Sequence, residues 1–269
     1  MTYVFTEADI TTEAQRLRDQ SAALDPLTAR LLRSAGLEPG MRVLDIGCGV
    51  GSVTALAADA VAPGGHVVGI DWSDDAVTGA RALLGDRDDV EFRAADANDL
   101  DGVEKGFDAV IGRMVLVHVP DPVAVLRTAA DHVRPGGVIC MHEPDMTYAW
   151  TSRPTPLWSH VRDGILTSFD HVGAHSRLGR DLFSVFRDAG LSDPEQIMEA
   201  PVGGGSASPA FGWANAYAAL LPLMESVGID VDETVPTEGL TEALDADAAA
   251  HNGTVIGPLM YGAWTRVPG

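Results

Sequence analysis

The sequence is poor in basic residues, above all in lysine. Lys105 is the single lysine, and 18 Lys and Arg residues stand against 39 Asp and Glu residues, which gives a formal net charge of −21. Enzymes that track a nucleic-acid backbone need clustered basic side chains. The composition therefore argues against a nucleic-acid substrate, and the acidic excess itself indicates little about the fold.

Cysteine is also scarce, and long apolar runs are lacking. The two cysteines, Cys48 and Cys140, form neither a metal-ligand spacing nor a disulfide framework. No apolar run approaches the roughly 20 residues of a membrane-spanning helix, and Met1–Ile10 lacks the basic start and apolar centre of a signal peptide. We therefore expect a soluble, cytoplasmic protein with no membrane partner and no metal, whose oligomeric state the sequence leaves open.

Short apolar runs rich in β-branched residues alternate with helical stretches rich in Ala, Leu and Arg. This alternation predicts an α/β fold with a parallel sheet and crossover helices. Pro63-Gly64-Gly65 and Pro135-Gly136-Gly137 end two of the helices, as breakers do. The expected strands are Arg42–Ile46, His66–Ile70, Val90–Ala94, Phe107–Gly112 and Gly137–His142, then a sixth near Gln196–Val202 and a last near Val255–Arg266.

Two later segments interrupt this alternation. The first, Pro144–Ser176, is rich in Trp, Pro and His. The second holds the helical stretches Pro209–Val227 and Thr237–Ala250. With 269 residues and 46% hydrophobic content, one core with insertions is the simplest organisation. We expect a single domain with an N-terminal helical cover at 1–36, a ligand-binding core at 37–143, a lid insertion at 144–176, a core continuation at 177–205, a second lid insertion at 206–250 and the last strand at 251–269.

The densest functional signal is a strand that leads through a glycine turn into a helix, Val43-Leu44-Asp45-Ile46-Gly47-Cys48-Gly49-Val50-Gly51. Its G-x-G-x-G spacing differs from the G-x-G-x-x-G fingerprint that binds a dinucleotide diphosphate. Asp71 ends the next strand, where a carboxylate accepts from a ribose diol, and Asp96 follows the third strand. Singly, the turn can serve packing, and either Asp can be a cap or a solvated strand end. Together they predict a nucleoside pocket without a phosphate clamp.

From about Leu37 to Asp145 the sequence resembles the class I S-adenosylmethionine-dependent methyltransferases. The resemblance implies a Rossmann-like, seven-stranded, mostly parallel sheet with helices on both faces, here with helical lid insertions. It also implies S-adenosylmethionine as the cofactor. Asp45 would support the residues that contact the cofactor without contacting it itself. The cofactor contacts that it implies are Gly47, Cys48, Gly49 and Gly51 for the methionyl portion, Asp71 for the ribose, Trp72, Asp96 and Ala97 for the adenine, and Arg113, Met114 and His118 near the amino group and the methyl.

Departures from other branches of this family narrow the chemistry. Gly112-Arg113-Met114-Val115 stands where amino-methylating nucleic-acid enzymes have Asp-Pro-Pro-Tyr or Asn-Pro-Pro-Tyr. Glu143 and Asp145 alone supply too few oxygens for Mg²⁺. What remains resembles metal-independent enzymes of secondary metabolism and quinone synthesis, which methylate a small, aromatic or polycyclic acceptor. A cyclisation guided by the bound cofactor, or a non-catalytic cofactor-binding module, are the alternatives.

Removal of a proton from the acceptor needs a base, and histidine is suited to this task. His118 follows the fourth expected strand and is the first candidate, while Glu143 ends the fifth and can orient His118 or accept a proton itself. Packing or capping for His118, and an ordinary loop acid for Glu143, are the competing interpretations. His142 and Asp145 are second choices, although strand alternation directs His142 away from the face of Glu143.

Four further residues are assigned from their place in the expected helices. Gln20 lies on the inward face that the leucines of Leu17–Leu31 define, and it is either a satisfied core amide or a cofactor contact. Trp158, His171 and Trp213 belong to the two lid insertions. We expect them to contact the substrate, with lid packing as the alternative.

Overall fold

The computed structural model describes residues 10–209, 211–229, 231, 235 and 238–268. The chain forms two compact units. The first, called the sheet unit, comprises Asp25–Pro144, Leu178–Met198 and Met260–Gly269. The second, called the helical unit, comprises Met1–Leu24, Asp145–Arg177 and Glu199–Leu259.

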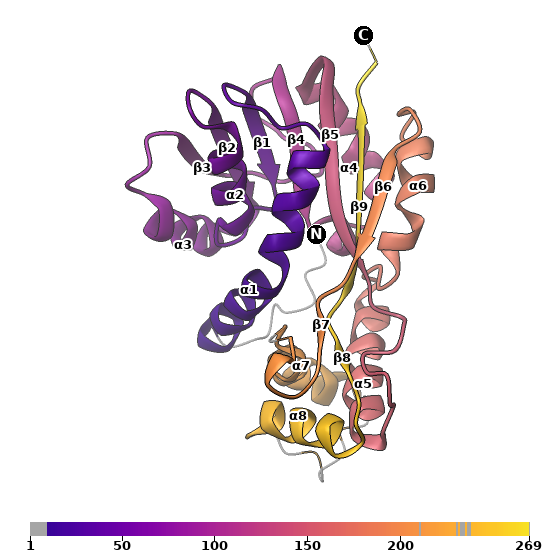
Figure 1. The fold of residues 1–269 in the computed structure, drawn as a ribbon. Helices are drawn as coiled ribbons and strands as arrows, with labels where there is room; N and C mark the ends of the chain where they lie inside the picture. Colours follow the sequence, from indigo (N-terminus) through magenta and orange to yellow (C-terminus); the bar gives the residue numbers. More distant parts are fainter. Residues whose placement is uncertain (1–9, 210, 230, 232–234, 236–237, 269) are drawn as a thin grey trace. The chain divides into compact units, whose positions relative to one another are not determined.

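The sheet unit is built on a seven-stranded sheet in the order β3-β2-β1-β4-β5-β9-β6 (Figure 1). The pairs β1–β2, β1–β4, β2–β3 and β4–β5 are parallel. The order reverses direction between β1 and β4, and ligands bind beyond the carboxyl ends of strands at such a switch point. The strands are β1 Arg42–Ile46, β2 His66–Asp71, β3 Val90–Ala94, β4 Phe107–Arg113, β5 Val133–Asp145, β6 Glu195–Glu199 and β9 Leu259–Arg266.

The C-terminal end of α1 (Ile10–Ser34) and α2 (Ser52–Val61) bury one face of this sheet. The C-terminal end of α1 and the apolar face of α2 share a cluster with alternate residues of β1, β2, β4 and β5. Helix α3 (Asp74–Leu84) begins at Ser73, whose side chain accepts from the Ala76 N–H, and it packs on β3. Helix α4 (Pro122–His132) packs on β4 and on α6 (Leu178–Asp188).

The helical unit consists mainly of α5 (Pro156–Val172), α7 (Trp213–Val227) and α8 (Leu240–Ala250), which contact one another (Figure 1). A short ribbon of β7 (Val202–Gly203) and β8 (Val255–Ile256) accompanies them. The indole of Trp150 stacks on that of Trp213 with ring centroids 3.7 Å apart. This aromatic pair is part of the unit's own core.

The sequence prediction of a seven-stranded, mostly parallel sheet is confirmed, and the differences lie at element ends. Strand β5 begins at Val133 and not at Gly137, because Val133 already pairs with Phe107 before a register shift. The last expected strand is divided into β8 and β9. Helices α7 and α8 begin later than expected, after Gly212 and Gly239, which both have positive φ. Both expected lid insertions contribute to the helical unit, and residues 1–9 of the expected cover lie outside the described residues; the lid role stays a prediction.

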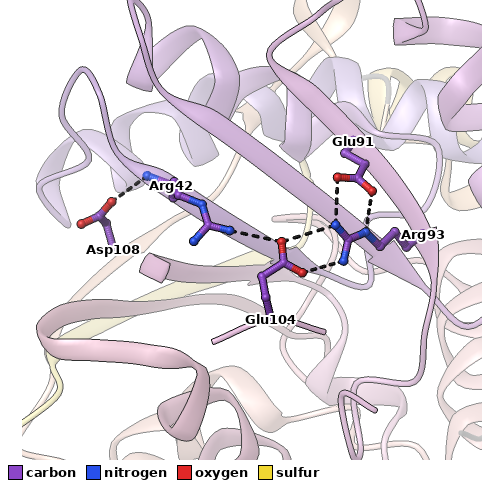
Figure 2. Close-up of polar contacts among 5 residues, drawn as sticks. All are labelled: Arg42, Glu91, Arg93, Glu104 and Asp108. Atoms are coloured by element: carbon purple, nitrogen blue, oxygen red, sulfur yellow. Dashed lines mark hydrogen bonds and ion pairs between the residues drawn. The ribbon is translucent and has the colours of Figure 1, made fainter. Parts of the chain in front are cut away.

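Ion pairs through Glu104 join β1 to β3, and a backbone hydrogen bond joins β1 to β4 (Figure 2). The Arg42 guanidinium lies 3.1 Å from Glu104, which also pairs with Arg93, and Arg93 holds Glu91 in a two-pronged contact. The Arg42 backbone N–H donates to Asp108 at 2.7 Å. Arg42 opens β1 and Asp108 lies near the start of β4, so these residues are remote from the carboxyl ends of the two strands. The pairs are partly exposed, and each contributes little to stability.

Within the described part of the chain, no helix combines the length and the apolarity needed to cross a membrane.

Candidate functional site

The turn between β1 and α2 carries three glycines, each with positive φ: 65° at Gly47, 52° at Gly49 and 89° at Gly51. A Cβ atom at Gly47 would lie 2.6 Å from Val115 Cγ2, and one at Gly51 would lie 3.2 Å from a ring atom of Phe92. At Gly49 such an atom would meet nothing within 4 Å. Gly47 and Gly51 are therefore needed for close packing, whereas Gly49 turns backbone toward open space that a ligand can enter.

Asp71, the last residue of β2, holds this turn in place. Its Oδ2 accepts from the Gly49 N–H at 2.9 Å and its Oδ1 from the Ser73 N–H at 3.0 Å. Burial raises the pKa of Asp71, although these N–H donors act in the opposite direction. Each carboxylate oxygen keeps a second lone pair, so Asp71 can still accept from a diol. Trp72 beside it is 45% exposed, which leaves the indole available to a flat ring.

Asp96 lies just past β3, next to β2 in the sheet. Its Oδ1 accepts from the backbone and the side-chain amide of Asn98, at 2.9 and 2.6 Å. Ala97 is buried behind it. Because β1, β2 and β3 are neighbours in order, the glycine turn, Asp71 and Asp96 follow one edge of the sheet.

Asp45 lies in β1 beneath the glycine turn and is almost wholly buried. Its Oδ2 accepts from the Thr54 hydroxyl at 2.6 Å. Burial raises the pKa of Asp45 to about 7, against the hydrogen bond from Thr54 and the charge of Arg113. Among the described residues, the second oxygen, Oδ1, has no hydrogen-bond partner. A buried acceptor without a partner fits a site whose remaining donor comes from a ligand or a water.

The segment after β4 is held by Glu143. Met114 adopts a positive φ of 54°, and Val115 leads into a short 3-10 helix, η1 (Leu116–His118). Glu143 Oε1 accepts from the N–H groups of Val115 and Leu116 at 3.1 and 3.0 Å, and Oε2 from that of Val117 at 3.2 Å. Burial raises the pKa of Glu143 to about 8, although the three N–H donors lower it. The carboxylate contacts the backbone of the segment that ends at His118, and the expected role of Glu143 toward His118 stays a prediction.

The side chain of Arg113 makes contacts that the sequence did not reveal. Its Nη1 donates to Asp25 at 2.8 Å and to the Thr28 hydroxyl at 2.9 Å, both on α1. Thr28 also contacts His142 Nδ1 at 3.1 Å. Burial, with the nearby Arg113 charge, lowers the pKa of His142 to about 3, so this imidazole is neutral. Asp25 and Thr28 lie about one helical turn apart on α1, and this spacing is a sequence signal that could have indicated a shared contact.

The other candidates lie in the helical unit. Trp158 and Trp213 are buried, and their indole N–H groups each donate to a backbone oxygen at 3.2 Å, of Leu244 and Ile256 respectively. His171 is exposed near the end of α5, and Gln20 is buried on α1. Their expected roles toward substrate and cofactor stay predictions. Asp145, the other second choice, accepts at Oδ1 from the Thr147 N–H and hydroxyl.

Over the described ranges, no group of three or more His, Cys, Asp and Glu side chains is arranged to hold a metal ion.

Comparison with known proteins connects this site to one family. The family model described as "Methyltransferase domain" matches residues 37–180, more than half of the chain. Ubiquinone biosynthesis O-methyltransferase of Xanthomonas campestris is 36% identical over 130 residues, which are 47% of this chain and 53% of that protein. Demethylmenaquinone methyltransferase of Halalkalibacterium halodurans is 28% identical over 203 residues, or 69% of this chain and 80% of that protein.

A solved structure shares the fold. Phosphoethanolamine N-methyltransferase 2 of Haemonchus contortus, in complex with phosphomonomethylethanolamine and S-adenosylhomocysteine, has a TM-score of 0.58 at 15% identity, covering 91% of this chain and 53% of that chain. The chain spans about half the length of several curated relatives that it matches.

The raised pKa of Asp45 gives a prediction for the pH dependence of stability without cofactor. The folded protein binds a proton at Asp45 that the unfolded chain releases, so the stabilisation from this group is present below about pH 4 and lost as the pH rises to about 7. Three pH units at about 1.4 kcal/mol each set an upper limit on the order of 4 kcal/mol. Urea unfolding should therefore show a shallower pH dependence for Asp45→Asn than for the wild type. The exposed Asp75→Asn is the control, and parallel curves for wild type and Asp45→Asn would contradict the prediction.

Proposed function

Because the chain belongs to the methyltransferase-domain family, among the class I S-adenosylmethionine-dependent methyltransferases, we propose that it transfers a methyl group to a small molecule. The observation that carries this proposal is the pairing of Gly49 with Asp71 at the carboxyl edge of the sheet. This pairing leaves open space at Gly49, and the buried carboxylate of Asp71 beside that space can still accept hydrogen bonds. S-adenosylmethionine supplies a methyl group already activated on a positively charged sulfur.

The residues at this edge fit that cofactor part by part. The turn at Gly47, Cys48, Gly49 and Gly51 would hold the methionyl portion, and Asp71 the ribose hydroxyls. Trp72, Asp96 and Ala97 would hold the adenine, and the backbone of Arg113 and Met114 the amino group. Oδ1 of Asp45 has no hydrogen-bond partner in the described part of the chain. This supports the assignment, because a buried acceptor favours a ligand that brings donors and positive charge. The protein's main tasks are then to align the acceptor and to exclude water.

The acceptor that we propose is a small aromatic compound such as a phenol or a hydroquinone. Two relatives are named as methyltransferases of ubiquinone biosynthesis and of demethylmenaquinone. Their names support an aromatic acceptor of this kind. A phenolic oxygen must lose its proton during the reaction, so a base assists it, whereas a neutral amine can attack first.

His118 is the base that we propose. It is the last residue of η1, just beyond the carboxyl end of β4, and it is 8% exposed. Its backbone N–H donates to the Val115 carbonyl at 3.0 Å, so the contacts that hold Val115 also place His118. A general base contributes typically about 10²–10⁴-fold to a rate.

Substitution of Asp71 tests the cofactor site. Asp71→Ala should weaken S-adenosylmethionine binding by roughly 10- to 100-fold, because a charge-assisted acceptor is lost and the Gly49 N–H loses its partner. Calorimetry on the folded variant measures the affinity. Asp75→Asn, an exposed carboxylate four residues away, should bind as the wild type does. An unchanged affinity for Asp71→Ala would mean that the ribose lies elsewhere.

Turnover tests the reaction and its base. The wild type, incubated with S-adenosylmethionine and a panel of phenols, hydroquinones and amines, should form S-adenosylhomocysteine and a product heavier by one methyl group, both seen by mass spectrometry. His118→Ala should lower this turnover about 10²-fold with near-normal cofactor affinity, and His66→Ala, at the start of β2, should not. Conversion of an acceptor without S-adenosylhomocysteine would favour cyclisation, and normal turnover of His118→Ala across pH 6 to 9, the range that brackets histidine titration, would exclude it as the base.

A further inference from the structure

We propose that Glu143 is a positioning residue, whose carboxylate fixes residues 115–117 against the glycine turn and so sets the place of both the turn and His118. The proposal rests on the proposed function, since it assigns a role at the same site. It differs from a base, because Glu143 acts through the backbone of its neighbours and touches no reacting atom.

The first support is the number of donors that this one carboxylate receives. The N–H groups of Val115, just before η1, and of Leu116 and Val117, its first two residues, have no partner within a helix. All three donate to Glu143, at 3.0 to 3.2 Å, and Glu143 is fully buried. A buried N–H group left without a partner is costly, so this carboxylate is what allows the segment to turn there.

The second support is that the backbone of Glu143 is itself held closely. A Cβ atom at Gly179, in the first turn of α6, would lie 2.7 Å from the Glu143 carbonyl oxygen and 2.9 Å from the Pro144 carbonyl carbon. Just before Glu143, His142 pairs with Arg113 in the sheet and accepts from the Met114 N–H at 3.0 Å. The backbone that carries the Glu143 carboxylate is therefore held in one position.

The third support is the side chain of Val115, which fills the space left by two glycines. Cβ atoms would lie 2.6 Å from Val115 Cγ2 at Gly47 and 2.9 Å from Val115 Cγ1 at Gly112. Val115 thus packs directly on the first glycine of the turn. A displacement of Val115 must disturb that turn, and it must also move His118, which bonds to the Val115 carbonyl.

Glu143→Gln tests this arrangement with little change in shape. The amide oxygen can still accept from Val115 and Leu116, but the amide nitrogen then faces the Val117 N–H, donor against donor. Hydrogen exchange of residues 115–117 should become about tenfold faster or more, because the Val117 N–H loses its acceptor and is left buried without a partner. Exchange in β1 and β2 should stay unchanged, and the affinity for S-adenosylhomocysteine, measured by calorimetry, should fall severalfold.

Two further variants separate positioning from a general loss of stability. Glu104→Gln makes the same chemical change in the partly exposed ion-pair network of β1 and β3, and it should alter neither exchange at 115–117 nor the affinity. Val115→Ala keeps the carboxylate and its three donors but removes the methyl groups that pack on Gly47. It should weaken S-adenosylhomocysteine binding while exchange at 115–117 stays slow, and it serves as the test if Glu143→Gln does not fold.

The outcomes distinguish this proposal from the proposed function. Slow, wild-type exchange at 115–117 in Glu143→Gln overturns the positioning role, and so does an unchanged S-adenosylhomocysteine affinity in Val115→Ala. Failure of the wild type to bind S-adenosylhomocysteine overturns the proposed function. The exchange comparison needs no ligand and reports only on the hydrogen bonds between Glu143 and residues 115–117.

Discussion

Backbone N–H groups in the loops that leave the central strands need acceptors that the sheet does not provide, and buried carboxylates meet this need at two places. Asp71 accepts from the turn after β1, and Glu143 accepts from the segment after β4. Asp71 is the last residue of β2 and Glu143 lies two residues before the end of β5, so each is anchored by the sheet while it holds a loop from the neighbouring strand. The irregular backbone at this edge is therefore determined by side chains from the most regular part of the fold.

These carboxylates also set the electrostatic character of the edge. Burial raises the pKa values of Asp45, Asp71 and Glu143 alike, because a low-dielectric surrounding disfavours the charged form. Arg113 is a buried basic group whose charge acts on Asp45, and its side chain is paired with Asp25 of α1. The edge is thus built to favour donors and positive charge, and this preference is local, since it depends on buried groups and not on the net charge of the surface.

The sequence predicted the elements and the edge well, because both depend on local patterns. The strands of the sheet follow from short apolar runs, and the order of glycine turn, Asp71 and Asp96 follows from a topology with few alternatives. The partners of Glu143 and of the Arg113 side chain could not be predicted in this way. They depend on contacts between segments distant in sequence, such as Glu143 with Val115 and Arg113 with Asp25. The start of β5 was missed for the same reason, since its pairing with Phe107 outweighs the local breaker Pro135-Gly136.

The packing of Val115 on Gly47 and Gly112 has a consequence for how this sequence can vary over evolution. The three positions share one small volume, so a side chain at position 47 or 112 requires a residue smaller than valine at position 115. Gly47 is recognised as part of a contiguous motif, yet the space that forbids a side chain there is filled by a residue after another strand. We therefore expect position 115 to vary together with the glycine motif during evolution. A redesign of the loop after β4 also changes the turn after β1.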